Sequence, residues 1–316
     1  MPARPLRPPP APRARGAAPR SGFWGFGGAA QHVPCQRLRG ARRCPSPGSH
    51  FSCLAGRSYQ PDVDKDELQQ PPQCFCFQEL QGPEPAGGPH RTRLLILDDQ
   101  RIHLPHWAKV VLGNATAARY VAGLGVHWYM DPIVPPGCSL EATHKLFPDH
   151  FLLYTEACSG VFSFRFAVSL GCWERGDQYS HSILTVLNHF VAGWTDWNLV
   201  LDLEGGPNWV KNFVDSPVIV DGSKDVFYKQ PMFYHLGHFS KFIPEGSRRV
   251  GLHSSRRCLL CQLEHVAVLR PDGALVLVVL NRFGWDVPFG IRDPAMGFIE
   301  TVALAHSIQT YLWRQQ

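Results

Sequence analysis

The sequence predicts an α/β domain followed by an antiparallel β module, both placed after an N-terminal stretch without the pattern of a folded domain. Two observations predict the α/β part: strand-like apolar runs begin near residues 94, 124, 151 and 191, and helical segments lie between them. This alternation is typical of consecutive parallel βα units. A third observation predicts the β module, because short strand-like runs and a Pro-Asp-Gly turn dominate the chain after residue 240.

Residues 1–90 are rich in Arg, Pro and Gly. The first 61 residues hold ten Arg and no acidic residue, so the other 255 residues carry 21 basic and 26 acidic groups. With so few branched apolar side chains, this stretch cannot offset the entropy of ordering. Its basic character suits nucleic acid or an anionic surface, but its aromatic residues are clustered rather than interleaved with Arg. We therefore favour a disordered or aberrant segment and expect no nucleic-acid partner.

Membrane-spanning, secreted and metal-binding classes receive little support from the sequence. The longest apolar run, residues 274–280, is far shorter than the roughly 20 residues that span a bilayer. The first 20 residues lack the apolar core of a signal peptide. The pair Cys258 and Cys261 forms a lone CxxC motif without a second pair, so we expect no metal site and no cofactor.

The first two predicted strands end in polar residues. Residues 94–97 form the first strand, which runs into Asp98 and Asp99. Apolar side chains at helical spacing predict a helix over residues 106–121. The second strand, residues 124–128, carries His127 and leads to Tyr129.

The next two strands follow the same rule. A short helix over residues 140–147 precedes the strand at residues 151–154, and Glu156 follows directly. A longer helix over residues 175–190 precedes the strand at residues 191–199, which includes Asp196. Polar residues at four strand ends in succession predict a shared barrel mouth, where such folds place their chemistry. Taken alone, Glu156 fits a solvated loop carboxylate equally well.

After residue 240 the predicted elements are strands. They cover residues 265–269, 274–281, 287–291 and 307–313, and Pro271, Asp272 and Gly273 form a hairpin turn between the first two. We expect an antiparallel, sandwich-type module packed beside the βα part. The predicted domains are therefore residues 91–240 and 241–316, after the segment at residues 1–90.

Seven longer motifs carry a family resemblance. They are LDDQR at 97–101, LPHWAKV at 104–110, VHWY at 126–129, TEAC at 155–158, GWTDWN at 193–198, EGGPNWV at 204–210 and YKQPMFYHLGHFSKFIPEG at 228–246. Over about residues 92–316 the chain resembles the glucosylceramidases (acid β-glucosidases) of glycoside hydrolase family 30. The resemblance implies a (β/α)8 barrel with a β-sandwich side domain, of which this chain holds the C-terminal half of the barrel.

The resemblance also implies roles for individual residues. Glu156 is expected to be the nucleophile of a retaining mechanism that passes through a covalent glucosyl-enzyme. The positions that match the family's sugar pocket are His127, Tyr129, Trp197 and Asn212, with Cys158 as a wall of the site rather than a nucleophile. Trp128 and Trp194 are expected to serve packing.

Substrate, partner and location follow from the same resemblance. It implies glucosylceramide at a membrane surface as substrate, a saposin-type activator protein as partner, and the lysosome as compartment. Asn114, Ala115 and Thr116 form an N-glycosylation sequon, which has meaning only in a protein of the secretory pathway.

One feature of the family is missing from the sequence. Retaining hydrolysis needs a second carboxyl group about 5–5.5 Å from the nucleophile. The family supplies it from an Asn-Glu-Pro motif at the end of the fourth barrel strand, and this motif does not occur in the 316 residues. Glu67, Glu79 and Glu84 follow no predicted strand, so the acid/base is expected to be absent.

The count of barrel units leads to the same expectation. Four βα units are predicted after residue 90, whereas closure needs eight, and four more would need about 120 residues at about 30 each. We therefore expect a truncated or mis-spliced form, or an imperfect gene model, of a glucosylceramidase whose own activity is in question. The alternative is a non-catalytic remnant that binds a partner protein, or the intact enzyme, through its exposed sheet edge.

Overall fold

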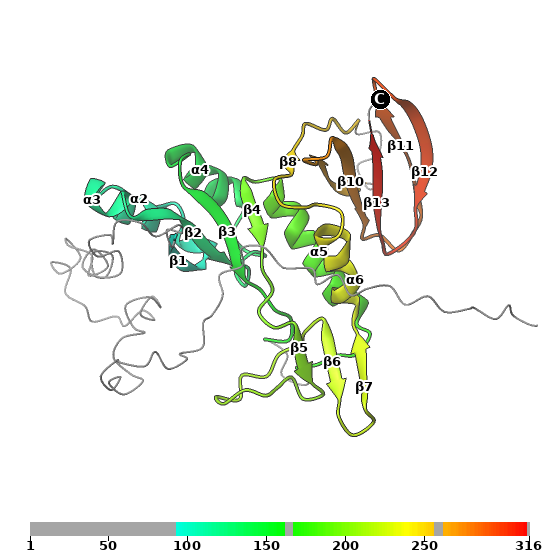
Figure 1. Cartoon of the computed structure of the whole chain (residues 1–316), viewed down its shortest axis with the longest axis horizontal. Helices are drawn as coiled ribbons and strands as arrows, with labels where there is room; N and C mark the ends of the chain where they lie inside the picture. The colour runs from blue at the N-terminus through cyan, green and yellow to red at the C-terminus, as the bar shows by residue number, and fades with distance from the viewer. Residues whose placement is uncertain (1–92, 162–166, 256–261, 315–316) are drawn as a thin grey trace, which may run out of the picture. The chain divides into compact units, whose positions relative to one another are not determined.

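A computed structural model of the chain describes residues 93–161, 167–255 and 262–314. The basic segment at residues 1–90, the motif at Cys258 and Cys261 and the three upstream Glu residues lie outside these ranges. Within them the elements fall into a parallel sheet with helices, a small three-stranded sheet, and two antiparallel sheets (Figure 1).

The parallel sheet confirms the predicted succession of βα units. Its strands are β1 (Leu94–Gln100), β2 (Val121–His127), β3 (Phe151–Glu156) and β4 (Val191–Trp194), in the order β1-β2-β3-β4. Every neighbouring pair is parallel. This is the arrangement of successive strands in a β/α barrel, and it brings their carboxyl ends to one edge.

The helix predicted over residues 106–121 is wrong in its second half. The structure has α2 (His106–Leu112), then a break, then the short α3 (Ala115–Ala118). Asn114 causes the break, because its backbone is extended and its side-chain oxygen accepts the backbone N–H groups of Thr116 and Ala117. The chain at residue 121 already belongs to β2.

The other helices agree better with prediction. The short helix at residues 140–147 is a π turn (Gly137–Glu141) continued by α4 (Ala142–Leu146), and the longer one is α5 (Trp173–Leu187). A 3-10 turn, Arg101–His103, follows β1. The strand predicted over residues 191–199 ends early, at Trp194.

Two elements of the region after β4 were not predicted. One is the sheet of β5 (Val200–Asp202), β6 (Val218–Asp221) and β7 (Val226–Lys229), whose strands have only three or four residues each. The other is α6 (Pro231–Ser240), which begins with proline at its first turn.

The antiparallel module confirms the strands predicted after residue 240. β8 (Arg248–Arg249), β9 (Glu264–Leu269), β10 (Ala274–Asn281) and β13 (Ser307–Arg314) form one sheet in the order β13-β10-β9-β8. β11 (Val287–Asp293) and β12 (Gly297–Ala303) form the other, and neither β8 nor β12 had a predicted counterpart. Gly273 adopts φ +80° in the predicted hairpin turn, where its N–H donates to Arg270 O.

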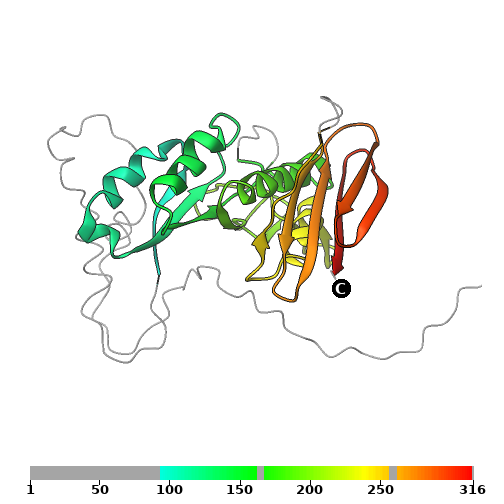
Figure 2. The same cartoon turned by 90° about the horizontal axis from the view of Figure 1, so that it is seen from above.

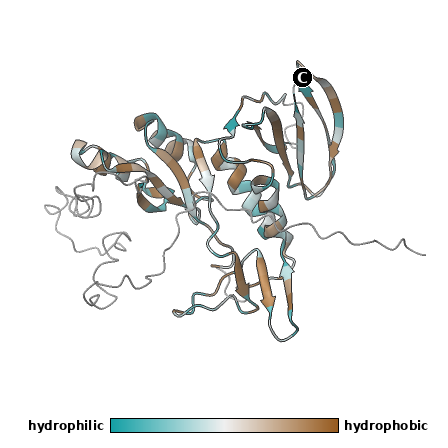
Figure 3. Ribbon diagram, viewed as in Figure 1, coloured by the Kyte–Doolittle hydropathy of each residue, from teal (hydrophilic) through white to brown (hydrophobic). Residues whose placement is uncertain are grey.

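Two hydrophobic clusters organise these layers. The first packs the helix-facing side chains of the parallel sheet, including Leu124, Leu152 and Tyr154, against α2. The second joins α5 and α6 to one face of the β9–β10 sheet, with Leu184 and Phe239 on the helices. Apolar residues run along β3 and β10 (Figure 3). Figure 2 shows α5 beside the antiparallel strands. The α5–α6 pair is therefore a layer shared by both parts.

Candidate active site

The carboxyl edge of the parallel sheet gathers the predicted strand-end residues. His127 is the register partner of Glu156, and a register shift in β2 immediately precedes it. A second shift lies between Leu97 and Asp99 in β1, where Leu97 and Asp98 adopt left-handed φ values of +73° and +53°. Bulges of this kind re-aim side chains at sheet edges. Local irregularity therefore brings Asp98, His127 and Glu156 together.

Asp98 is fixed by contacts with two neighbouring strands. Its Oδ1 lies 3.1 Å from His127 Nε2 and accepts the Thr155 hydroxyl at 2.7 Å. Gly125 makes room for this arrangement, because a Cβ there would lie 3.0 Å from Thr155 Oγ1 and 3.2 Å from Asp98 Oδ1. Asp98 thereby orients the imidazole that faces the predicted nucleophile.

His127 lies between two carboxylates. Its Nε2 is 3.7 Å from Glu156 Oε2, in addition to the 3.1 Å contact with Asp98. Burial lowers the pKa of His127, but the hydrogen bond that its ring donates to Asp98 and the charges of Glu156, Asp98 and Asp99 outweigh it and raise the pKa above 6.5. At acid pH an imidazolium therefore stands beside Glu156.

Tyr129 connects Glu156 to Cys158. The phenol donates to Glu156 Oε1 at 3.0 Å, and the same oxygen lies 3.2 Å from Cys158 Sγ. Burial, with the charge of Glu156, raises the pKa of Tyr129, so the phenol remains a donor. Since that single proton goes to Glu156, the thiol of Cys158 donates to the phenol oxygen. Burial raises the pKa of Cys158 to about 12, which leaves a neutral thiol unsuited to nucleophilic attack.

The two remaining predicted residues form no hydrogen bond with these side chains in the described part of the chain. The backbone N–H of Trp197 donates to Ala157 O at 2.9 Å, which places the residue beside the end of β3, and 46% of it is exposed. Asn212 is exposed, and in the described part of the chain its side chain makes no hydrogen bond with His127, Tyr129, Glu156 or Cys158. Trp128 and Trp194 pack edge-to-face against each other and border the first hydrophobic cluster.

A buried network behind Tyr129 was not predicted. Arg101 Nε lies 3.1 Å from Asp131 Oδ1, and its Nη2 donates to the Asp131 carbonyl at 2.7 Å. Tyr154 donates to the same carboxylate at 2.9 Å. These contacts anchor the chain two residues after Tyr129. The sequence signal was an Arg just after one strand end and an Asp just after the next.

Asp196, two residues after the end of β4, has a buried carboxyl group. It accepts the Tyr179 hydroxyl and the Trp197 N–H on Oδ1, each at 2.9 Å. Its Oδ2 is inaccessible and has no partner among the described residues. Burial raises the pKa of Asp196 to about 7 against these two hydrogen bonds, which favour the ionised form. The group is therefore protonated in acid and ionises near neutral pH.

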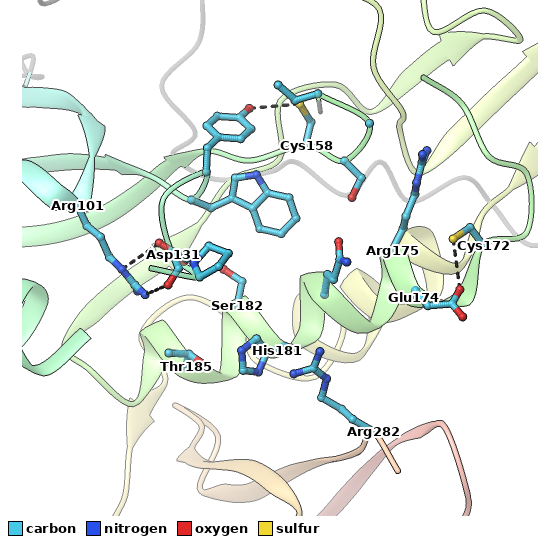
Figure 4. Close-up of a pocket in the computed structure, with 17 residues that line it drawn as sticks. Arg101, Asp131, Cys158, Cys172, Glu174, Arg175, His181, Ser182, Thr185 and Arg282 are labelled. Carbon is cyan, nitrogen blue, oxygen red and sulfur yellow. Dashed lines mark hydrogen bonds and ion pairs between the residues drawn. The ribbon is translucent and has the colours of Figure 1, made fainter. Parts of the chain in front are cut away.

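A cavity of about 670 Å³ adjoins the site. Tyr129 and Cys158 form part of its wall, whereas Glu156 does not line it. Figure 4 shows Arg101 paired with Asp131, and the α5 residues His181, Ser182 and Thr185 below them. Among the described residues no group of three or more His, Cys, Asp or Glu side chains is arranged to hold a metal ion.

The comparison with family models decides the membership of the chain. The model of the glycosyl hydrolase family 30 TIM-barrel domain matches residues 78–243, more than half of the chain. The model of the family 30 β-sandwich domain matches residues 246–311. The chain belongs to glycosyl hydrolase family 30. The fold of a TIM barrel with a β-sandwich domain, predicted from the sequence, is confirmed at the level of the family.

Curated relatives carry the resemblance further. Lysosomal acid glucosylceramidase of Mus musculus is 55% identical over 269 residues, which is 85% of this chain and 49% of that protein. Putative glucosylceramidase 4 of Caenorhabditis elegans is 43% identical over 208 residues, 65% of this chain and 39% of that protein. This family 30 chain spans about half the length, or less, of the curated relatives that it matches.

Solved structures agree on the fold. SrfJ from Salmonella typhimurium superposes with a TM-score of 0.63 at 29% identity, covering 71% of this chain and 48% of SrfJ. The endo-β1,6-glucanase BT3312 gives 0.61 at 20% identity, covering 71% of this chain and 49% of that one, which supports the fold alone. No helix in the described ranges of this family 30 chain is long and apolar enough to cross a membrane.

Proposed function

We propose that this chain carries the nucleophile of a retaining β-glucosidase, and that Glu156 is that nucleophile. The observation that carries the proposal is the position of Glu156 at the carboxyl edge of the parallel sheet, 3.0 Å from the Tyr129 hydroxyl and 3.7 Å from His127 Nε2. Carboxylates serve as nucleophiles in glycosidases, and here a hydrogen-bond donor orients the carboxylate.

Each contact has a role in the proposed step. The Tyr129 hydroxyl fixes Oε1 and thereby sets the direction of the carboxylate. A Glu156 oxygen attacks the anomeric carbon of the sugar, and an ester bond forms as the glycosidic C–O bond breaks. The electron pair of that bond leaves with the aglycone oxygen. The His127 ring, 3.7 Å from the other carboxylate oxygen, borders the nucleophile on the side of Oε2.

The lack of a second catalytic carboxyl group limits the reactions that the chain can catalyse. A retaining mechanism uses it to protonate the leaving oxygen and then to activate water. The Asn-Glu-Pro motif of the family is absent from the 316 residues. Loss of general acid catalysis lowers rates by about 10² to 10⁴. We therefore expect Glu156 to react with sugars that carry a good leaving group, and poorly with an alkyl glycoside.

The proposed substrate is glucosylceramide, which would be cleaved to glucose and ceramide in sphingolipid metabolism. Support comes from the 55% identity to a mouse protein named lysosomal acid glucosylceramidase. Trp197, half exposed beside the end of β3, offers an aromatic face for a sugar ring, and Asn212 offers an amide for a hydroxyl. We propose the lysosome as compartment and a saposin-type activator as partner on the same basis, with the domains divided near residue 241.

A second candidate function is binding without catalysis. In the described ranges β1 and β4 are the outer strands of the parallel sheet, each paired on one side only. Unpaired strand edges accept further strands. The occupant would be a partner protein or the intact enzyme, and this function does not require Glu156 to react.

Leaving-group dependence tests the proposal. We expect turnover of 2,4-dinitrophenyl β-glucoside, faster release of dinitrophenol with added azide, and β-glucosyl azide as product, because azide needs no general base. Natural glucosylceramide should react far more slowly. Glu156→Gln is the matched control, since it keeps the shape of the side chain. Equal turnover by the wild type and this variant would contradict the role of Glu156 as nucleophile. The non-catalytic binding function would then remain as the candidate.

A further inference from the structure

Asn114 is the one asparagine of this chain with the N-glycosylation pattern. The 316 residues contain six Asn, and only Asn114 is followed two positions later by Ser or Thr, with Ala115 between. We propose that Asn114 is an N-glycan acceptor whose glycan projects from the end of the sheet opposite the Glu156 site. The proposal depends on passage through the secretory pathway and not on hydrolytic activity.

The amide of Asn114 is accessible in the folded chain. Residues 113–116 are all exposed, and none of them has a side chain larger than Asn or Thr. Oδ1 accepts the N–H groups of Thr116 at 2.9 Å and Ala117 at 3.1 Å, whereas Nδ2 makes no hydrogen bond within the described ranges. One atom of the amide therefore caps α3, and the atom that takes the glycan is available.

The covalent chemistry preserves that cap. The donor is an oligosaccharide linked to a polyprenyl diphosphate. The bond between sugar C1 and the diphosphate oxygen breaks, and the diphosphate leaves with its electron pair. A bond forms between C1 and Asn114 Nδ2, which releases one proton. Because the product is still an amide, its carbonyl oxygen remains an acceptor for the two N–H groups. The glycan and the helix cap are compatible.

The position of α3 keeps the glycan away from the catalytic edge. α3 lies just before Val121, the first residue of β2, while His127 at the other end of β2 pairs with Glu156. Since all four strands are parallel, Asn114 belongs to the amino-terminal edge of the sheet. Figure 1 shows α3 beyond the start of β2, away from its arrowhead. A glycan at Asn114 therefore leaves the approach to Glu156 open.

The test uses the full chain behind a cleavable secretory leader, with a tag sequon at the C-terminus to report entry into the secretory lumen. Asparagine amidase treatment in H₂¹⁸O should convert Asn114 to ¹⁸O-labelled Asp, detected in the peptide by mass spectrometry. Asn114→Asp and Thr116→Ala should each lose one glycan on a gel. Thr116→Ser should retain it, because Ser completes the sequon.

The matched variant separates the modification from folding. Asn114→Asp keeps an oxygen that caps α3 but has no Nδ2, so the expected result is loss of the glycan with the melting temperature of unglycosylated wild type made without the leader. Reactivity of Glu156 with an activated glucoside should be unchanged by removal of the glycan. A chain whose tag is glycosylated while Asn114 remains unmodified would overturn the proposal.

Discussion

At the scale of single residues, the hydrogen bond between Tyr129 and Glu156 gives the most direct prediction about the reaction rate. Tyr129→Phe removes the donor 3.0 Å from Oε1 and leaves the ring in place. A hydrogen bond to a charged group contributes about 1.5–3 kcal/mol, which corresponds to roughly 10- to 100-fold in rate. We expect glycosylation of Glu156 by an activated glucoside to slow by that factor, measured by stopped-flow release of the leaving group.

The thiol of Cys158 supplies a control for that experiment. Cys158→Ser keeps a donor to the phenol oxygen, whereas Cys158→Ala removes it. A smaller loss of rate in the serine variant than in the alanine variant would agree with a positioning role for the thiol. A Tyr129→Phe rate equal to that of the wild type would contradict the role assigned to Tyr129.

Gly125 supports the site through the space that it leaves. Gly125→Ala would place a methyl group 3.0 Å from Thr155 Oγ1 and 3.2 Å from Asp98 Oδ1. We expect this to push Asp98 from His127 and to return the raised pKa of His127 toward its ordinary value of 6.5. NMR titration of the His127 ring protons measures that change. An unchanged His127 pKa in a folded variant would show that Asp98 does not hold the imidazole.

Asp196 makes stability depend on pH. Its pKa is about 7 in the folded chain and ordinarily 3.8, so between these values the folded state binds a proton that the unfolded state has lost. The free energy of unfolding therefore falls as pH rises through this window, by up to about 1.4 kcal/mol per pH unit. Asn at this position is neutral at every pH and still accepts the two hydrogen bonds on Oδ1.

We expect Asp196→Asn to be more stable than the wild type at pH 7 and to lose most of that advantage near pH 4. Urea denaturation at both pH values measures the difference, and the other titrating groups cancel because they are common to both proteins. An equal difference at the two pH values would contradict the burial of this carboxyl group.

At the scale of elements, α5 holds the two parts of the chain together. Leu184 on α5 is 2% exposed and belongs to the cluster that includes Val266 of β9 and Val276 of β10. Leu→Ala at such a site lowers the free energy of unfolding by about 2–5 kcal/mol. We expect Leu184→Ala to lower the melting of both parts in a single transition, followed by calorimetry and by tryptophan fluorescence. Two separated transitions would show that the parts fold independently.

The helices and strands also show how much of the fold can be predicted from the sequence. Hydrophobic period alone predicts β1, β2, β3, α5, β10 and β13, because each is long enough for the pattern to emerge. The helix over residues 106–121 fails at Asn114, whose side chain caps a new helix where the apolar period continues unbroken. β5 to β7 are missed because runs of three or four residues are too short to show a period.

The candidate site divides in the same way. The sequence predicts that Asp98, His127 and Glu156 share an edge, because the ends of the strands can be recognised in it and parallel strands end at the same edge. The contact between Tyr129 and Cys158 does not follow, because it depends on how the two loops beyond β2 and β3 pack. The space at Gly125 also requires the register between strands. Individual roles at this site remain predictions.

At the scale of the whole molecule, the matched family models and the parallel sheet describe one scaffold. A TIM-barrel model ends at residue 243 and a β-sandwich model begins at residue 246, while the apolar cluster around α5 and α6 extends into both regions. The sheet presents Glu156 at its carboxyl edge and Asn114 near its amino edge. Chemistry and surface modification are therefore proposed for opposite ends of the same layer.

The most direct test of the account is covalent labelling of Glu156. The purified chain would be incubated with 2,4-dinitrophenyl 2-deoxy-2-fluoro-β-glucoside, whose leaving group departs without acid assistance, and its intact mass and peptides measured. We predict one fluoroglucosyl adduct on Glu156, lost in Glu156→Gln and slowed in Tyr129→Phe. A chain that stays unlabelled while a longer family 30 glucosylceramidase is labelled in parallel, or an adduct on another residue, would contradict the claim that this fold holds a working nucleophile.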